Sequence, residues 1–120
     1  MKEYTRLLAR QGLEPTRVRT PTGVTDLYIA GHGETEIIEA KSTARHSHVR
    51  EALGQLLDYA PDSPTPATRL AALFPQSPAY NDIQLLHRYG VDCIYRVSGA
   101  NFARQDAPDE RRSAMREIWN

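Results

Sequence analysis

The sequence predicts an α/β fold in which helices flank a mixed central β-sheet, and three observations support this class. Apolar residues recur at helical spacing through residues 47–60, which predicts an amphipathic helix. Residues 69–74 form a nearly continuous apolar run, which is typical of a strand buried on both faces. Residues 80–89 then predict a helix and residues 91–97 a strand, and a strand–helix–strand unit with short connections implies a right-handed crossover and a parallel pair.

The first half of the chain predicts an antiparallel meander that is entered by a helix. The supporting segments follow in order: a helix over residues 4–11 that ends before Gly12, short strands over 17–20 and 24–29 around a turn at 21–23, a break at 31–33, and a strand over 35–41. The helix over 47–60 comes next and stops at Pro61. The predicted element order is therefore αβββαβαβ.

Length and composition describe one domain. The chain has 120 residues, of which 40% are hydrophobic and 25% charged. We expect residues 1–100 to form the domain and residues 101–120 a polar C-terminal extension, either a helix or partly disordered. No apolar run approaches the ~20 residues that span a bilayer. The single cysteine, Cys93, is expected to be a core thiol, so we predict a soluble, cytoplasmic protein without membrane contact.

Balanced charge excludes a bulk electrostatic argument for nucleic-acid binding. Fifteen Lys and Arg match fifteen Asp and Glu, so any such argument must be local. Residues two apart in a strand share a face, so Glu39 and Lys41 project together. Asp26, in the preceding predicted strand, could be brought beside Glu39 by hairpin pairing. Two close carboxylates repel each other unless a cation neutralises them, and hard oxygen ligands suit Mg²⁺ or Mn²⁺.

These residues resemble the PD-(D/E)XK nuclease superfamily, which has a restriction-endonuclease-like fold. The resemblance covers residues 4–97 and rests on Asp26, on Glu39-Ala40-Lys41 at the end of an apolar strand, and on the following helix. That helix carries Gln55 and Tyr59 at the spacing of the Gln-xxx-Tyr element of some branches. Thr25 stands where the motif has its proline, a position at which many members differ.

The resemblance implies a Mg²⁺-dependent endonuclease, a phosphodiester hydrolase that acts on DNA in preference to RNA in defence or repair. Asp26, Glu39 and the Ala40 carbonyl would bind Mg²⁺ or Mn²⁺, which would polarise a phosphodiester and lower the pKa of a coordinated water. Lys41 would position or help to deprotonate that water and offset charge on the phosphorane oxygens. Gln55 and Tyr59, one helical turn apart, would orient Lys41, water or phosphate.

Each feature alone has a simpler interpretation. Asp26 could be an acid at a turn or strand edge, and Glu39 with Lys41 an exposed ion pair. Gln55 and Tyr59 could be the polar rim of an amphipathic helix. The order of all these features along one chain favours a nuclease-like site.

Six basic residues are weaker candidates for contact with nucleic acid, because a solvated basic surface explains them equally well. Four cluster at the start of the helix over residues 47–60, and two alternate on a strand that would flank the site: Arg45, His46, His48 and Arg50, and Arg17 and Arg19.

Two other functions stay open. One is an RNA-cleaving toxin or effector, and the other is a catalytically inert nucleic-acid-binding module of the same fold. Because affinity for the phosphate backbone comes from Lys and Arg, a neutral domain should grip nucleic acid weakly. A homodimer, or fusion to recognition domains, would then supply affinity and specificity.

Overall fold

The computed structural model describes residues 2–20, 23–24, 26–31 and 33–120, and its centre is a mixed five-stranded β-sheet in the order β3-β4-β5-β6-β7. The elements along the chain are α1 (Lys2–Arg10), β1 (Arg19–Thr20), β2 (Gly23–Val24), β3 (Leu27–Gly31), β4 (Glu34–Ala40), α2 (His46–Tyr59), a 3-10 turn (Ala60–Asp62), β5 (Arg69–Phe74), α3 (Tyr80–Arg88), β6 (Val91–Ser98), β7 (Asn101–Gln105) and α4 (Asp109–Trp119). The predicted α/β class, a mixed sheet flanked by helices, is confirmed.

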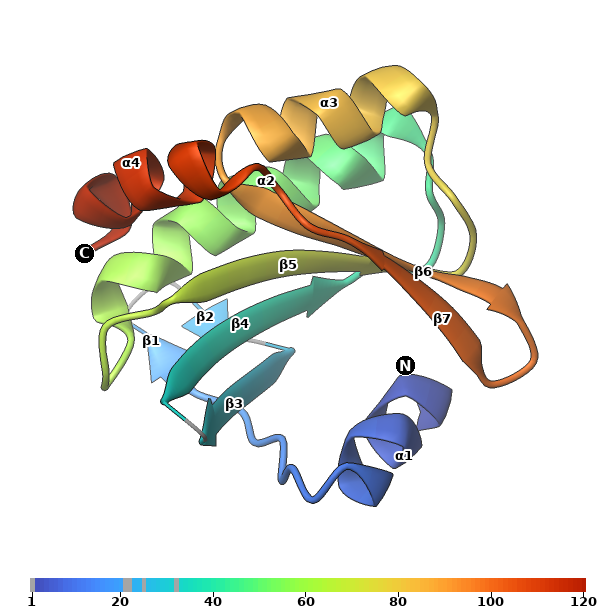
Figure 1. Ribbon diagram of the computed structural model, residues 1–120, viewed down its shortest axis with the longest axis horizontal. Coiled ribbons are helices and arrows are strands. Elements are labelled where there is room, and N and C mark those ends of the chain that lie inside the picture. The colour runs from blue at the N-terminus through green and yellow to red at the C-terminus, as the bar shows by residue number, and fades with distance from the viewer. Residues whose placement is uncertain (1, 21–22, 25, 32) are drawn as a thin grey trace.

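The central strands of the sheet are parallel and the outer strands are antiparallel. β4 pairs with β5 and β5 with β6 in parallel, because α2 and α3 carry the chain back between them. β3 and β7 close the two edges as antiparallel partners of β4 and β6. The carboxyl ends of β4, β5 and β6 therefore lie together, and they form the carboxyl edge of the sheet (Figure 1).

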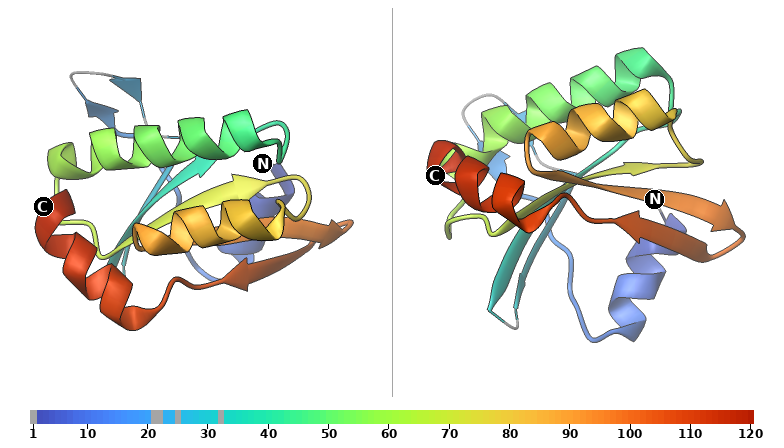
Figure 2. Two further views of the ribbon diagram at one scale, coloured as in Figure 1. Left: turned by 90° about the horizontal axis from the view of Figure 1, so that it is seen from above. Right: turned by 45° about the horizontal axis from the view of Figure 1, so that its top comes forward.

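Helices cover both faces of the sheet. α2 and α3 lie side by side on one face, and α1 lies on the other (Figure 2). Alternation along β4 sends Ile37 to the α2 face and Ile38 to the α1 face, and both side chains are fully buried. Apolar residues on both faces of a strand thus reflect two helical layers.

The predicted three-stranded meander is wrong in its first strand. β1 and β2 form a separate two-stranded sheet, and the segment before β1 touches the main sheet through a bridge from Thr16 to Tyr28. The strand predicted over 24–29 is interrupted, since the chain bends at Asp26 before β3 begins. Most of the predicted turn at 21–23, and Thr25 at the position of the motif's proline, lie outside the described residues.

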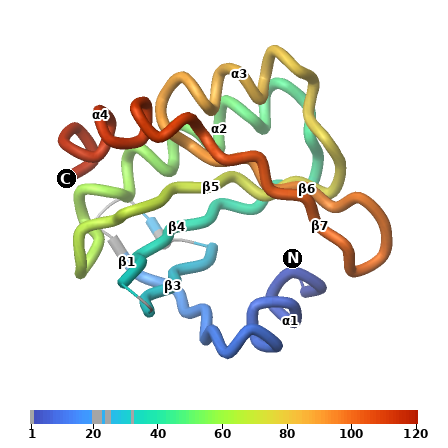
Figure 3. Tube along the Cα trace, in the orientation of Figure 1, coloured from blue at the N-terminus to red at the C-terminus, as the bar shows by residue number. Residues whose placement is uncertain are grey.

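The C-terminal segment is part of the fold. Residues 101–105 form the edge strand β7, and residues 109–119 form α4, whose Trp119 is only 1% exposed. The chain returns to the start of β5, where the Asn120 side-chain amide donates to the Ala67 carbonyl at 3.3 Å (Figure 3). A polar composition concealed this packing, because Trp119 and Met115 are the only apolar side chains of α4 that join the core among the described residues.

Two expectations concern the environment of the protein. Cys93 is fully buried, and burial raises the pKa of its thiol to about 12, which agrees with a core thiol. In the part of the chain that the structure describes, no helix is both long and apolar enough to cross a membrane.

Candidate active site

The structure brings Asp26 and Glu39 together at the carboxyl end of β4. Leu27 pairs with Ile38 in the antiparallel register of β3 and β4, so Asp26 stands opposite Glu39 at the next position. The Asp26 N–H donates to Glu39 Oε1 at 3.1 Å, and the Ala40 N–H donates to Asp26 Oδ2 at 2.9 Å. Each carboxylate thus accepts a main-chain hydrogen bond, and this reciprocal pair fixes both side chains.

The environment of Glu39 disfavours its charged form. The side chain is buried, with the residue 3% exposed. Burial and the neighbouring charge of Asp26 raise the pKa of Glu39 to about 7, although the Asp26 N–H and the positive charge of Lys41 act in the opposite direction. At neutral pH Glu39 is therefore partly protonated. This proton reduces the repulsion between the two carboxylates, which a bound cation could also do.

Tyr59 lies over the acids from the last turn of α2. It is 7% exposed, and burial, followed by the negative charges of Glu39, Asp58 and Asp26, raises the pKa of its hydroxyl. The hydroxyl thus stays protonated as a hydrogen-bond donor. It also lies against Gly23 in β2, where an added Cβ would come within 2.7 Å of Oη. Gly23 therefore leaves room for the tyrosine, a role that the sequence did not indicate.

Gln55 lies one turn before Tyr59 on the same side of α2. Its Oε1 atom is buried without a hydrogen-bond partner. Because an unpaired buried acceptor costs about 1–3 kcal/mol, such an atom in a native site indicates a partner that is not part of the chain, such as water or a ligand. The spacing of Gln55 and Tyr59 was visible in the sequence, but their burial was not.

Lys41 follows directly after β4. Its N–H donates to the Leu73 carbonyl of β5 at 2.9 Å, and its charge acts on the Glu39 carboxylate. Successive residues of a strand point their main-chain groups to opposite sides, so the N–H and C=O of Ala40 face Asp26 rather than β5. The Ala40 carbonyl is therefore directed toward the acid pair.

The donor set suits a hard divalent cation that retains water. It consists of the Asp26 and Glu39 carboxylates and the Ala40 carbonyl. Within the described residues no group of three or more His, Cys, Asp or Glu side chains is arranged to hold a metal ion. Mg²⁺ is usually held by one or two carboxylates with several waters, whereas a structural zinc site needs more protein ligands. The residues present thus fit Mg²⁺ or Mn²⁺.

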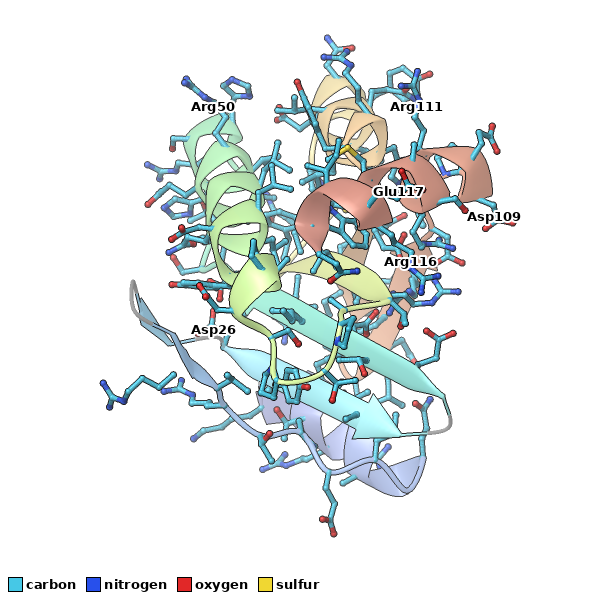
Figure 4. All side chains as sticks on the ribbon, turned by 90° about the vertical axis from the view of Figure 1, so that its left-hand side faces the viewer. Asp26, Arg50, Asp109, Arg111, Arg116 and Glu117 are labelled. Atoms are coloured by element: carbon cyan, nitrogen blue, oxygen red, sulfur yellow. The ribbon has the colours of Figure 1, made fainter. Side chains whose placement is uncertain are left out.

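The basic residues at the start of α2 lie at the opposite end of the helix from Tyr59. His46 Nδ1 lies 2.5 Å from Oδ1 of the buried Asp82 of α3, and His48 Nδ1 lies 2.7 Å from Thr43 Oγ1. Arg45 precedes the helix and is exposed. Arg50 projects into solvent, far from Asp26 (Figure 4). Among the described residues, the contacts of His46 and His48 are thus with Asp82 and Thr43, and a role of these four residues in binding nucleic acid stays a prediction.

Arg17 and Arg19, the two candidate arginines that precede β2, differ in their relation to the site. Arg17 is 62% exposed, and its guanidinium approaches Asp26 Oδ1 at 4.0 Å. Arg19 lies in β1 and is exposed. Arg17 thus borders the acid pair.

A second ionic centre, which the sequence analysis missed, occupies the opposite edge of the sheet. The carboxylate of Asp92 in β6 is fully buried and accepts hydrogen bonds from Arg69, Arg104 and Arg112 and from the Ala107 N–H at 2.7 Å. Burial acts to raise the pKa of Asp92, but the Ala107 and Arg104 hydrogen bonds outweigh it and hold the pKa below its usual range. An acid inside an apolar strand was the only available signal.

The larger hollow of the protein, about 560 Å³, is separate from the acid pair. It lies on the α1 face, with apolar side chains such as Leu7, Leu8 and Ile29 along its wall, and Asp26, Glu39 and Lys41 are not among its lining residues. The arginines at its end are Arg69 and Arg104, which the Asp92 centre already engages. Its size therefore does not identify it as the catalytic centre.

Comparison with known proteins identifies a solved structure of similar fold. No family model matches the chain, and no curated protein matches it significantly. A similar solved structure is the crystal structure of a repair endonuclease from Pyrococcus abyssi, with a TM-score of 0.57 and 17% sequence identity. The fold is shared with this endonuclease. The similarity covers 83% of this chain and 47% of the other, so the chain spans about half the length of that neighbour.

Proposed function

We propose that this domain is a Mg²⁺-dependent endonuclease of the PD-(D/E)XK type that hydrolyses phosphodiester bonds. One observation carries the proposal: Asp26 and Glu39, thirteen residues apart, share main-chain hydrogen bonds at a strand end that also bears Lys41. Two adjoining carboxylates in a buried site repel each other unless a proton or a cation neutralises them, so the pair favours the binding of a cation. The likeness to a repair endonuclease supports the same reaction class.

Each residue of the site has a separate role in the proposed reaction. Asp26, Glu39 and the Ala40 carbonyl would hold the ion, which when bound polarises the phosphodiester and activates water for attack. Lys41 offsets negative charge that develops on the phosphoryl oxygens and orients the attacking water. Tyr59 donates its hydroxyl proton as a hydrogen bond into the site, and Gln55 Oε1 accepts one there.

DNA is the proposed substrate, because the neighbour of this fold is described as a repair endonuclease. The net charge of zero indicates that the domain alone holds a polyanion weakly. We therefore infer that a second copy or attached recognition domains increase affinity, and that cleavage of both strands requires two sites. Buried Cys93 suits the reducing cytoplasm, where we place the protein.

The test compares cleavage of supercoiled plasmid, labelled DNA and labelled RNA with and without Mg²⁺. We expect wild type to nick DNA only with Mg²⁺ or Mn²⁺, and Asp26→Asn and Lys41→Met to lose at least about 100-fold in rate. The matched control is Asp109→Asn, an exposed acid on α4 (Figure 4), which should leave the rate unchanged.

The outcome separates the alternatives. Preferential cleavage of RNA would identify an RNA-cleaving effector. Equal background activity in wild type and both site variants, with retained binding of nucleic acid, would identify an inert scaffold.

A further inference from the structure

A second, smaller hollow lies at the same edge of the sheet as the acid pair. Its volume is about 100 Å³, and Ala40 and Lys41 of the candidate site form part of its wall. The other wall residues include Glu3 of α1, Pro75 after β5 and Arg96 of β6. The hollow therefore shares Ala40 and Lys41 with the candidate site, while Asp26 and Glu39 are not among its lining residues.

Arg96 is the basic side chain that β6 contributes to this hollow. Alternation along β6 puts Arg96 on the same face as Ile94, which packs in the α1 layer. Its guanidinium Nη1 lies 3.9 Å from Glu3 Oε1, and the two side chains are 40% and 41% exposed. An ion pair this long and exposed contributes little to stability, so a better partner can displace it.

Other arginines on this side of the sheet are already committed to structure. Arg69 and Arg104 donate to Asp92, whose carboxylate is fully buried. Arg96 is instead held by one weak surface pair at the edge where substrate must bind. A guanidinium presents a planar fork of donors that matches phosphate oxygens.

The negative charge of the substrate favours a basic side chain in this hollow. The acid pair needs a cation to bind the scissile phosphate at all, and the flanking phosphates of the strand carry further negative charge. Lys41 and Arg96 line the same hollow, so a strand bound at Lys41 can also contact Arg96.

We propose that Arg96 binds the phosphate adjacent to the scissile phosphodiester, in the hollow beside Lys41. In the free protein the Glu3 carboxylate pairs with the Arg96 guanidinium, and the phosphate displaces it. This inference rests on the proposed function for its substrate class, a nucleic-acid strand.

The test measures binding and cleavage separately. A fluorescent oligodeoxynucleotide is titrated with wild type, Arg96→Ala, Arg96→Lys and Glu3→Gln in Ca²⁺, and cleavage is followed in Mg²⁺. The matched control is Arg111→Ala, an exposed arginine on α4 (Figure 4). Circular dichroism confirms that each variant is folded.

We expect Arg96→Ala to weaken binding about 10-fold and to reduce the slope of log affinity against log salt by about 0.7–0.9, the value for one lost phosphate contact. Arg96→Lys should lose less, and Arg111→Ala nothing. Glu3→Gln should bind at least as tightly as wild type, because it removes the competitor of the phosphate. If the ion pair were only structural, Arg96→Ala and Glu3→Gln would weaken binding equally, and that result would overturn the proposal.

A neutral methylphosphonate, moved one phosphate at a time along the oligonucleotide, identifies the contact. Wild type should lose affinity at the phosphate beside the cleaved bond, and Arg96→Ala should lose nothing further there. Equal losses in both proteins at every position would refute the contact. If wild type binds with this pattern but never cleaves, the nuclease assignment fails while the Arg96 contact stands. An absence of binding by wild type would overturn both.

Discussion

Replacing Glu39 by Gln should stabilise the protein in the absence of metal. The side chain keeps its shape, still accepts the Asp26 N–H, and gains an N–H that can donate to Asp26. Folding raises the pKa of Glu39 from the ordinary 4.5 to about 7. At ~1.4 kcal/mol per pKa unit, this difference corresponds to roughly 3 kcal/mol of destabilisation once the carboxyl is ionised in both states.

The sign of the pH dependence follows from proton binding. Between pH 4.5 and about 7 the folded protein retains a proton on Glu39 that the unfolded chain has lost, so the stability of wild type falls as pH rises through this window. Glu39→Gln lacks this loss. The variant should therefore match wild type near pH 4 and exceed it by roughly 3 kcal/mol near pH 8.

Urea denaturation in EDTA, at several pH values from 4 to 8, measures the difference in unfolding free energy. Glu110→Gln is the matched control, because Glu110 is exposed on α4 and should give no such difference. Mg²⁺ should then stabilise wild type, by about 2.7 kcal/mol at 100 times its Kd, and leave Glu39→Gln nearly unchanged. A difference curve that is flat with pH would refute the account of the acid pair.

Two further predictions concern side chains that hold the fold and the site in place. Gly23→Ala should displace the Tyr59 hydroxyl and lower the cleavage rate about 10-fold or more, whereas Gly54→Ala, on an open face of α2, should keep full activity and gain about 0.5–1 kcal/mol of stability. Equal rates for both variants would show that the position of Tyr59 does not matter. Asp92→Asn should lower the unfolding free energy by about 3–5 kcal/mol, since three arginines lose their buried partner. Asp109→Asn, whose side chain is 94% exposed, should cost less than about 1 kcal/mol in the same urea titration, and comparable losses would contradict a special role for Asp92.

The sequence was sufficient to predict features that depend on local periodicity. The apolar stripe of α2 and the run of β5 each match the structure closely, with β5 at the predicted bounds of 69–74. The proximity of Asp26 and Glu39 followed from hairpin geometry, because a turn between two strands fixes which residues stand opposite.

Features that depend on contacts distant in sequence could not be predicted. Tyr59 belongs to a polar helical stripe by composition, but its burial depends on β2, more than thirty residues earlier. β7 is an edge strand with mostly exposed residues, so its sequence lacks the alternation of a half-buried strand. The arginines around Asp92 come from β5, β7 and α4, and only the assembled sheet reveals that they converge on one buried carboxylate.

The two ends of the sheet show how one chain treats buried acids in opposite ways. At the amino edge, Asp92 has three arginines and a main-chain donor, so its pKa lies below the ordinary range and the charge is complete without any ligand. At the carboxyl edge, the acid pair has Lys41, main-chain donors and the exposed Arg17 at 4.0 Å from Asp26, and the pKa of Glu39 rises. The carboxylate of Asp92 is therefore held in its charged form, whereas Glu39 is partly protonated at neutral pH. This contrast supports the proposal that a bound cation neutralises the acid pair beside Lys41.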